Sequence, residues 1–308
     1  MADLTVQLGP LSLKNPVMTA SGTFGYGLEY HQFYDISQLG AVVVKGIRLA
    51  PSDGNPMPRT VEVTGGMLNA IGLQGPGIDR FLTDPHYLPG LRKTGAAVIV
   101  NIWGTSIEEY GDVAARLDAE GDGVAALEIN ISCPNVKAGG AAFGTVPELA
   151  AEVIRKVRKS TRLPIITKLS PNVTDITEFA RIAEAEGSDA VSLINTLGAT
   201  AIDIEKRSFV LANRFGGLSG PAVKPVALKM VWQTAQAVKI PIIGMGGIMN
   251  GADAVEFLLA GASAVAVGTA NFVEPTAPLE VIRFLGEYLD RHRFASVKEI
   301  VGTVRSPA

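Results

Sequence analysis

Cysteine is almost absent from this sequence, because Cys133 is the single cysteine among 308 residues. An internal disulfide is therefore excluded, as is a zinc or iron–sulfur site held by several cysteines of this chain. A lone thiol is consistent with a reducing compartment. The segment MADLTVQLGP has no basic region followed by an apolar stretch, so we expect no signal peptide and a cytoplasmic location.

Other features are scarce as well, and each scarcity argues against a class of function. The net charge is only −3, which argues against nucleic acid as a partner. The three histidines, His31, His86 and His292, do not end predicted strands, so we expect no metal site. No carboxylate pair suits hydrolysis, and no glycine pattern matches a dinucleotide-binding fingerprint. Residues 257–273 are uncharged, but their glycines and polar residues indicate a helix end, a turn and a buried strand instead of a membrane span.

Short apolar runs recur along the chain, separated by amphipathic stretches typical of helices. The runs cover residues 16–21, 41–46, 96–101, 126–132, 164–170, 190–196, 241–247 and 263–269. Eight such β/α units without a break in composition predict one closed (β/α)₈ (TIM) barrel, so we expect a single domain over residues 1–308.

Three segments exceed what a minimal barrel needs. TVQLGPLSLKNP, residues 5–16, predicts an N-terminal β-hairpin that closes the barrel floor. Residues 46–95 and 197–221 are too long for simple connections. Loops that follow barrel strands build the active-site face, so both insertions are expected to cover a ligand there.

Polar residues interrupt the apolar runs at or next to the carboxyl ends of strands, which converge on one face of a barrel. They are Lys45, Asn101, Asn130, Lys168 and Asn195. A buried ammonium group needs a compensating charge, and no acidic residue ends a matching strand. Glu128 lies earlier in its strand, so we assign it to the packed interior. The two lysines therefore predict a negatively charged ligand.

Glycines at the last two strands indicate what kind of ligand this is. Gly246 and Gly247 follow the seventh strand, and Gly268 and Thr269 follow the eighth. Glycine allows close approach of the backbone, whose N–H groups bind phosphate at helix starts. A flavin mononucleotide (FMN) and pyridoxal phosphate both fit. A barrel enzyme that forms a Schiff base on Lys45 or Lys168 stays open, as does a phosphate-binding scaffold subunit without chemistry of its own.

Cys133 stands close behind Asn130, before a proline that turns the chain away from the strand. A solitary cysteine is commonly a small buried hydrophobe. At the mouth of a barrel, however, a thiol with a reference pKa of about 8.5 can serve as a general base. No neighbouring histidine is evident to activate it as a nucleophile. We therefore favour a base.

Taken together, these residues resemble the dihydroorotate dehydrogenases, specifically the class 1 catalytic chain, over nearly the whole sequence. The likeness is carried by TASGTFGYG (19–27), KGI (45–47), NAIGLQGPG (69–77), NISCPNVKAGG (130–140), INTLGA (194–199), GGLSGPA (216–222), GMGGI (244–248) and VGTANF (267–272).

The resemblance implies oxidation of dihydroorotate to orotate over FMN, in the pyrimidine synthesis that leads to UMP. Cys133 would take the proton from C5 of the substrate while hydride leaves C6 for flavin N5. The substrate would be held by Lys45, Asn69, Asn130, Asn195, Thr196 and the segment Ala70, Ile71, Gly72 and Leu73. The flavin would be lined by Ser21, Lys45, Gly46, Asn101, Asn130, Lys168, Ile194 and Gly220, and its phosphate would lie at Gly246, Gly247, Gly268 and Thr269.

The stretch SCPNVKAGG resembles the NAD-dependent type (class 1B), and the fumarate-using class 1A homodimer is the alternative within class 1. The NAD-dependent type implies a homodimer of this chain together with an electron-transfer subunit. That subunit would carry FAD and a [2Fe–2S] cluster, because one cysteine here cannot hold the cluster.

Overall fold

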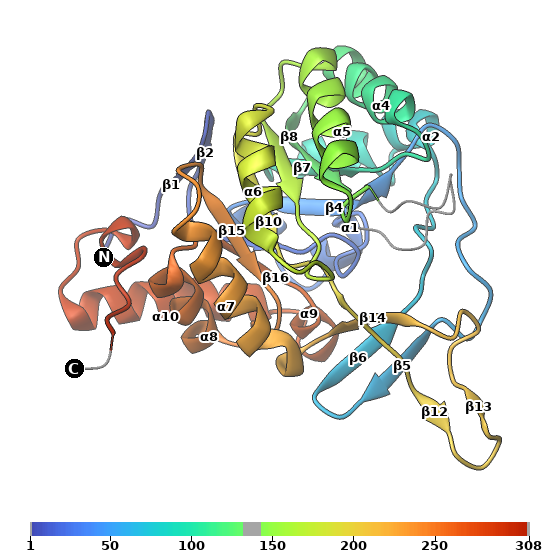
Figure 1. The fold of residues 1–308 in the computed structure, drawn as a ribbon. Helices are drawn as coiled ribbons and strands as arrows, with labels where there is room; N and C mark the ends of the chain where they lie inside the picture. The colour runs from blue at the N-terminus through green and yellow to red at the C-terminus, as the bar shows by residue number, and fades with distance from the viewer. Residues whose placement is uncertain (1, 132–142, 307–308) are drawn as a thin grey trace.

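The computed structural model describes residues 2–131 and 143–306, and its centre is an eight-stranded parallel sheet (Figure 1). Its strands are β3 (Val17–Thr19), β4 (Val42–Ile47), β7 (Val98–Ile102), β8 (Val124–Asn130), β9 (Ile165–Lys168), β10 (Ala190–Leu193), β15 (Ile242–Met245) and β16 (Ala264–Val267). They follow the order β3-β16-β15-β10-β9-β8-β7-β4. A parallel bridge between Met18 and Ala41 joins β3 to β4. The predicted (β/α)₈ barrel is confirmed.

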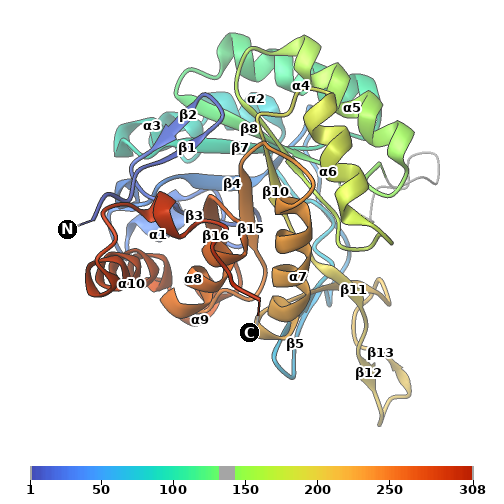
Figure 2. The same cartoon turned by 60° about the vertical axis from the view of Figure 1, so that its left-hand side comes forward.

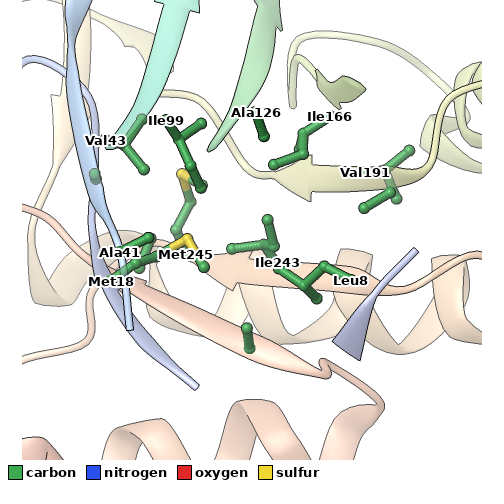
Figure 3. Packing of buried hydrophobic residues seen from close by; sticks show 14 of the residues in the cluster. Leu8, Met18, Ala41, Val43, Ile99, Ala126, Ile166, Val191, Ile243 and Met245 are labelled. Atoms are coloured by element: carbon green, nitrogen blue, oxygen red, sulfur yellow. The ribbon is translucent and has the colours of Figure 1, made fainter. Parts of the chain in front are cut away.

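These strands are almost entirely buried, because the barrel interior covers one face and helices cover the other. Figure 3 shows Val43 of β4 and Ile99 of β7 pointing toward Ile243 of β15. Each fully buried aliphatic side chain of this kind contributes roughly 1.5–3 kcal/mol to stability.

Helices surround the barrel in both ribbon views (Figures 1 and 2). They are α4 (Ile107–Glu120), α5 (Pro147–Ser160), α6 (Ile176–Ala185), α7 (Lys224–Ala235), α8 (Gly251–Ala260) and α10 (Ala277–His292), with the shorter α1 (Leu28–His31), α2 (Ile78–Thr83), α3 (Leu88–Thr94) and α9 (Ala270–Val273). Local signals fix where they begin: Ser106 caps α4 and Asp175 caps α6, while Asn250 and Asp253 form a capping box on α8. In the part of the chain described, no helix is long and apolar enough to cross a bilayer.

The predicted N-terminal hairpin is present as β1 (Val6–Leu8) paired antiparallel with β2 (Leu11–Leu13). Leu8 is 1% exposed and lies beside Ile243 of the barrel (Figure 3). The hairpin thus adds a hydrophobic plug to the barrel core.

The two insertions form a second sheet together. The first insertion contributes β5 (Thr60–Val63) and β6 (Gly66–Asn69), and the second contributes β11 (Leu197–Ala199) and β14 (Gly216–Ser219). The sheet has the order β11-β14-β6-β5, and β14 pairs with β6. Between β11 and β14, the hairpin of β12 (Ile202–Asp203) and β13 (Ser208–Phe209) projects from the molecule (Figures 1 and 2).

Candidate functional site

A cavity lies where the carboxyl ends of the barrel strands meet the insertion sheet, and most of the predicted site residues line it. They are Ser21, Lys45, Gly46, Asn69, Ile71, Gly72, Leu73, Asn101, Asn130, Lys168, Ile194, Asn195, Thr196, Gly220, Gly246, Gly247, Gly268 and Thr269. The structure therefore brings these residues together around one cavity. Cys133 lies outside the described residues.

Ala70 is the predicted site residue that stands behind the cavity wall. Its side chain is 1% exposed and packs in a small core with Leu68 and Leu211. Its backbone is also hydrogen-bonded: the N–H donates to Arg59 O at 2.7 Å, and the carbonyl accepts from Asn55 Nδ2 at 2.9 Å.

The buried charge at the cavity floor corrects one expectation from the sequence. Lys168 has a carboxylate neighbour after all, because Glu128 Oε2 lies 3.9 Å from Lys168 Nζ. Parallel neighbours in register bring this about: Asn130 of β8 pairs with Lys168 of β9, and Glu128 stands two residues before Asn130. The argument that Lys168 requires a ligand to supply negative charge was therefore wrong.

The amides of the floor are held in fixed positions. Asn101 Nδ2 donates to Glu128 Oε2 at 2.6 Å, and Asn130 Nδ2 donates to Asn101 Oδ1 at 3.4 Å. Tyr110 Oη supports the same strand end by donating to the carbonyl of Asn130 at 2.8 Å. Asn101 is fully buried. Its side chain is therefore already ordered by the fold, and ligand binding need not supply the conformational entropy of ordering it.

Lys45 is the second cationic residue of the cavity wall, and its electrostatic environment is unfavourable. Burial lowers the pKa of Lys45, and the nearby positive charge of Arg59 lowers it further, whereas Glu29 acts in the opposite direction. A partly desolvated ammonium group at a cavity wall attracts an anionic or electron-rich ligand.

The turn after β15 has a backbone shape that only glycine adopts readily. Gly246 and Gly247 have φ angles of +124° and +77°, and a Cβ at Gly247 would lie 2.8 Å from Gly220 O. At Gly268, by contrast, a Cβ would meet its nearest neighbour, Ala20 Cβ, at an ordinary 3.6 Å. Thus Gly247 is required by the fold, whereas Gly268 keeps space open at the cavity.

The insertion sheet supplies the opposite wall. Asn69 ends β6 and donates through Nδ2 to Gly217 O at 3.4 Å. Asn195 Oδ1 accepts from the N–H of Thr196 at 2.8 Å. Sequence reasoning did not assign several further lining residues: Gly22, Thr23, Thr60, Met67, Gly217, Ser219, Met245 and Phe272. Ser219 stands within GGLSGPA and could have been found there; Thr60 and Met67 carry no comparable signal.

In the described ranges, no group of three histidine, cysteine, aspartate or glutamate side chains could hold a metal ion. What the cavity offers is two ammonium groups, a set of amides and glycine turns. Fold and cavity together define a β/α barrel with a polar site at its carboxyl face, where barrel enzymes carry out their reactions.

The chain belongs to the dihydroorotate dehydrogenase family, whose sequence model matches residues 3–289. It is similar to the protein named dihydroorotate dehydrogenase B (NAD(+)), catalytic subunit, in several bacteria. The Desulforamulus reducens protein is 59% identical over 300 residues, which cover 97% of this chain and 98% of that one. The Parabacteroides distasonis protein is 57% identical over 304 residues, covering 99% of each chain, and the Citrifermentans bemidjiense protein is 56% identical over 302 residues, covering 98% of each. The family expected from the sequence is confirmed, and the names of these relatives are those of the NAD-dependent type.

Proposed function

We propose that this chain oxidises dihydroorotate to orotate in pyrimidine synthesis, as the catalytic subunit of an enzyme that passes the electrons to NAD⁺. The observation that carries the proposal is the convergence of Lys45, Lys168, Asn130 and the turn at Gly247 on one cavity. The names of the relatives favour the NAD-dependent reaction over the fumarate-dependent alternative.

The cavity fits an FMN cofactor, and the family is flavin-dependent. The open space at Gly268 and the positive φ angles of Gly246 and Gly247 give a phosphate close access to backbone N–H groups. Lys168 and Asn101, at the floor, would lie along the flavin ring. When bound, FMN would accept the hydride that leaves the substrate.

The protein's own residues would orient the substrate and move its proton. Amides both donate and accept hydrogen bonds, which suits a pyrimidine ring edge with alternating C=O and N–H groups, so Asn69, Asn130 and Asn195 would hold the ring together with Thr196. We propose Cys133, beyond the described residues, as the general base that takes the proton from C5. Lys45 would favour the negative charge that develops when this proton leaves.

The words "catalytic subunit" in the relatives' names imply that those enzymes have a further subunit. We propose that the partner of this chain carries FAD and a [2Fe–2S] cluster, since a chain with one cysteine cannot ligate the cluster itself. A homodimer of this chain and a cytoplasmic location stay predictions from the sequence.

The test starts from the purified chain. It should be yellow, and dihydroorotate should bleach the flavin absorbance in the absence of oxygen, while NAD⁺ should reoxidise the flavin only slowly without the partner. A chain that holds no flavin, or that borohydride traps as a Schiff base with a carbonyl compound, would contradict the proposal. Rapid NAD⁺ reduction by the isolated chain would count against the electron-transfer subunit.

A further inference from the structure

Glu128 is a buried charge beneath the cavity to which the proposed reaction assigns no role. It is 2% exposed and lies on β8 between the neighbouring strands β7 and β9. Its two oxygens each accept one short hydrogen bond: Oε2 from Asn101 Nδ2 at 2.6 Å, and Oε1 from Ser192 Oγ at 2.8 Å. A carboxylate held in this way cannot rotate without breaking one of these bonds.

The first bond determines the orientation of the Asn101 amide. An ionised carboxylate only accepts hydrogen bonds, so Asn101 must present its NH₂ group to Glu128. The carbonyl oxygen of that amide then faces away from Glu128, where it accepts from Asn130 Nδ2 at 3.4 Å. The same oxygen would lie 2.9 Å from a Cβ at residue 46, and a glycine stands there. Glu128 therefore determines which end of the Asn101 amide donates and which end accepts, and through Asn101 it also orients the Asn130 amide.

The second consequence concerns Lys168, which is 5% exposed. Its Nζ lies 3.9 Å from Glu128 Oε2, too far for a hydrogen bond. Within residues 2–131 and 143–306, no hydrogen bond from Lys168 Nζ is formed, and this ammonium group lines the cavity. Glu128 thus offsets the charge of Lys168 while Asn101 and Ser192 occupy its oxygens. The N–H donors of Lys168 are therefore available to a ligand in the cavity.

We propose that Glu128 is a positioning residue that sets the reduction potential of the flavin, by orienting Asn101 and by limiting the positive field of Lys168. The inference rests on the proposed function, because it requires FMN in this cavity. Reduced flavin is the more electron-rich form. Loss of the carboxylate charge leaves the field of Lys168 uncompensated and stabilises that form.

The experiment compares the wild-type chain with Glu128→Gln, both loaded with FMN, by equilibration with an indicator dye during slow enzymatic reduction. At about pH 6.5, the ratio of reduced to oxidised FMN at a fixed potential should rise about tenfold or more in the variant, which equals about 30 mV for two electrons. The other charged residue of the cavity wall, Lys45, is unchanged in this comparison. Equal ratios in both proteins would overturn the proposal.

Two further variants keep the test decisive even if Glu128→Gln does not fold. Ser192→Ala frees Oε1, so the carboxylate can turn toward Lys168, and the reduced fraction should fall instead of rise. A ratio equal to that of the wild type would overturn the proposal.

Glu109→Gln is the matched control: Glu109 is also buried, but it pairs with Arg48 at 2.8 Å and does not line the cavity. Glu109→Gln should lower the stability of the fold and leave the reduction potential of the flavin unchanged. If it shifted the potential as much as Glu128→Gln does, the effect would come from general destabilisation of the fold, and the proposal would be overturned.

Failure of this inference can be told apart from failure of the proposed function. A wild-type chain that does not bind FMN, or whose FMN is not reduced by dihydroorotate, contradicts the function itself. A wild-type chain that does both, with Glu128→Gln showing the wild-type potential, contradicts only the role of Glu128.

Discussion

Thr269 Oγ1 donates a hydrogen bond of 2.8 Å to Ser219 Oγ, and both hydroxyl groups line the cavity. Thr269 follows the last barrel strand, β16, whereas Ser219 ends β14 of the insertion sheet. The bond therefore fastens the second insertion to the barrel. A hydroxyl has one proton. Thr269 uses its proton in the bond to Ser219, so the proton of Ser219 remains available for a hydrogen bond to a ligand.

Replacing Ser219 with alanine should weaken FMN binding without unfolding the chain. The loss of one neutral hydrogen bond, about 0.5–1.5 kcal/mol, corresponds to an increase of the dissociation constant by roughly two- to tenfold. Titration of the flavin-free chain with FMN, followed by fluorescence quenching, measures it. Ser208→Ala on the projecting hairpin is the control, since Ser208 is exposed on β13. Equal dissociation constants for Ser219→Ala and the control would contradict a role for this hydroxyl.

Gly247→Ala and Gly268→Ala should separate stability from binding. At Gly247, a side chain meets Gly220 O at 2.8 Å and a φ of +77°, so the free energy of unfolding should fall by about 1–3 kcal/mol. At Gly268 the methyl group finds only an ordinary contact, so stability should change by less than about 0.5 kcal/mol. It would nevertheless stand where we propose the phosphate, and FMN affinity should drop about tenfold. Urea unfolding and FMN titration of both variants check these predictions. An FMN affinity of Gly268→Ala equal to that of the wild type would contradict the proposed position of the phosphate.

Lys45→Met should stabilise the fold and abolish most flavin reduction. Burial lowers the pKa of Lys45 in the folded chain, with Arg59 adding to the effect. Below that lowered pKa, the folded chain holds the proton less tightly than the unfolded chain, so Lys45 reduces stability there. This penalty fades as the pH rises through the folded pKa toward the ordinary value of about 10.4.

Urea midpoints should therefore increase in Lys45→Met at pH 7, and the gain should shrink near about pH 10. Lys229→Met, at an exposed position of α7, provides the control and should show no such trend. A midpoint for Lys45→Met below that of the wild type at pH 7 would show that Lys45 contributes favourable contacts that outweigh its desolvation.

Cys133→Ser tests the proposed base, which the described ranges do not include. A hydroxyl ionises far less readily than a thiol of reference pKa about 8.5, so flavin reduction by dihydroorotate should be mostly lost near pH 7 and partly recovered in alkali. Anaerobic stopped-flow measurements across pH give the answer. Rates like those of the wild type at pH 7 would remove Cys133 from the mechanism.

The barrel could be predicted from the sequence because its strands are buried on both faces. Each apolar run contains or overlaps a barrel strand, as residues 41–46 do with β4 and residues 263–269 with β16. The site followed from the same pattern, since a polar residue at the end of an apolar run, such as Asn101 or Lys168, can only face the barrel mouth or a buried partner.

What could not be predicted depends on neighbours in space. The partnership of Glu128 with Lys168 requires the register of β8 against β9, and an apolar run does not state its register. Ala70 lies within a stretch that otherwise lines the cavity. Its side chain nevertheless faces the other way and packs in a small separate core. The pairing of β6 with β14 joins segments about 150 residues apart, and both are rich in glycine. Neither the hydrophobic periodicity of these segments nor their spacing in the sequence predicts that they pair.

The ladder between β6 and β14, with Leu68 opposite Leu218, makes the roof of the cavity a joint product of two distant parts of the chain. Transplanting either excursion alone onto another barrel would leave a naked strand edge, which invites aggregation. Length changes in one would likewise need a compensating change in the other. For protein engineers, the two segments are one exchangeable module, and chimeras that respect this linkage are the ones that should retain a closed roof.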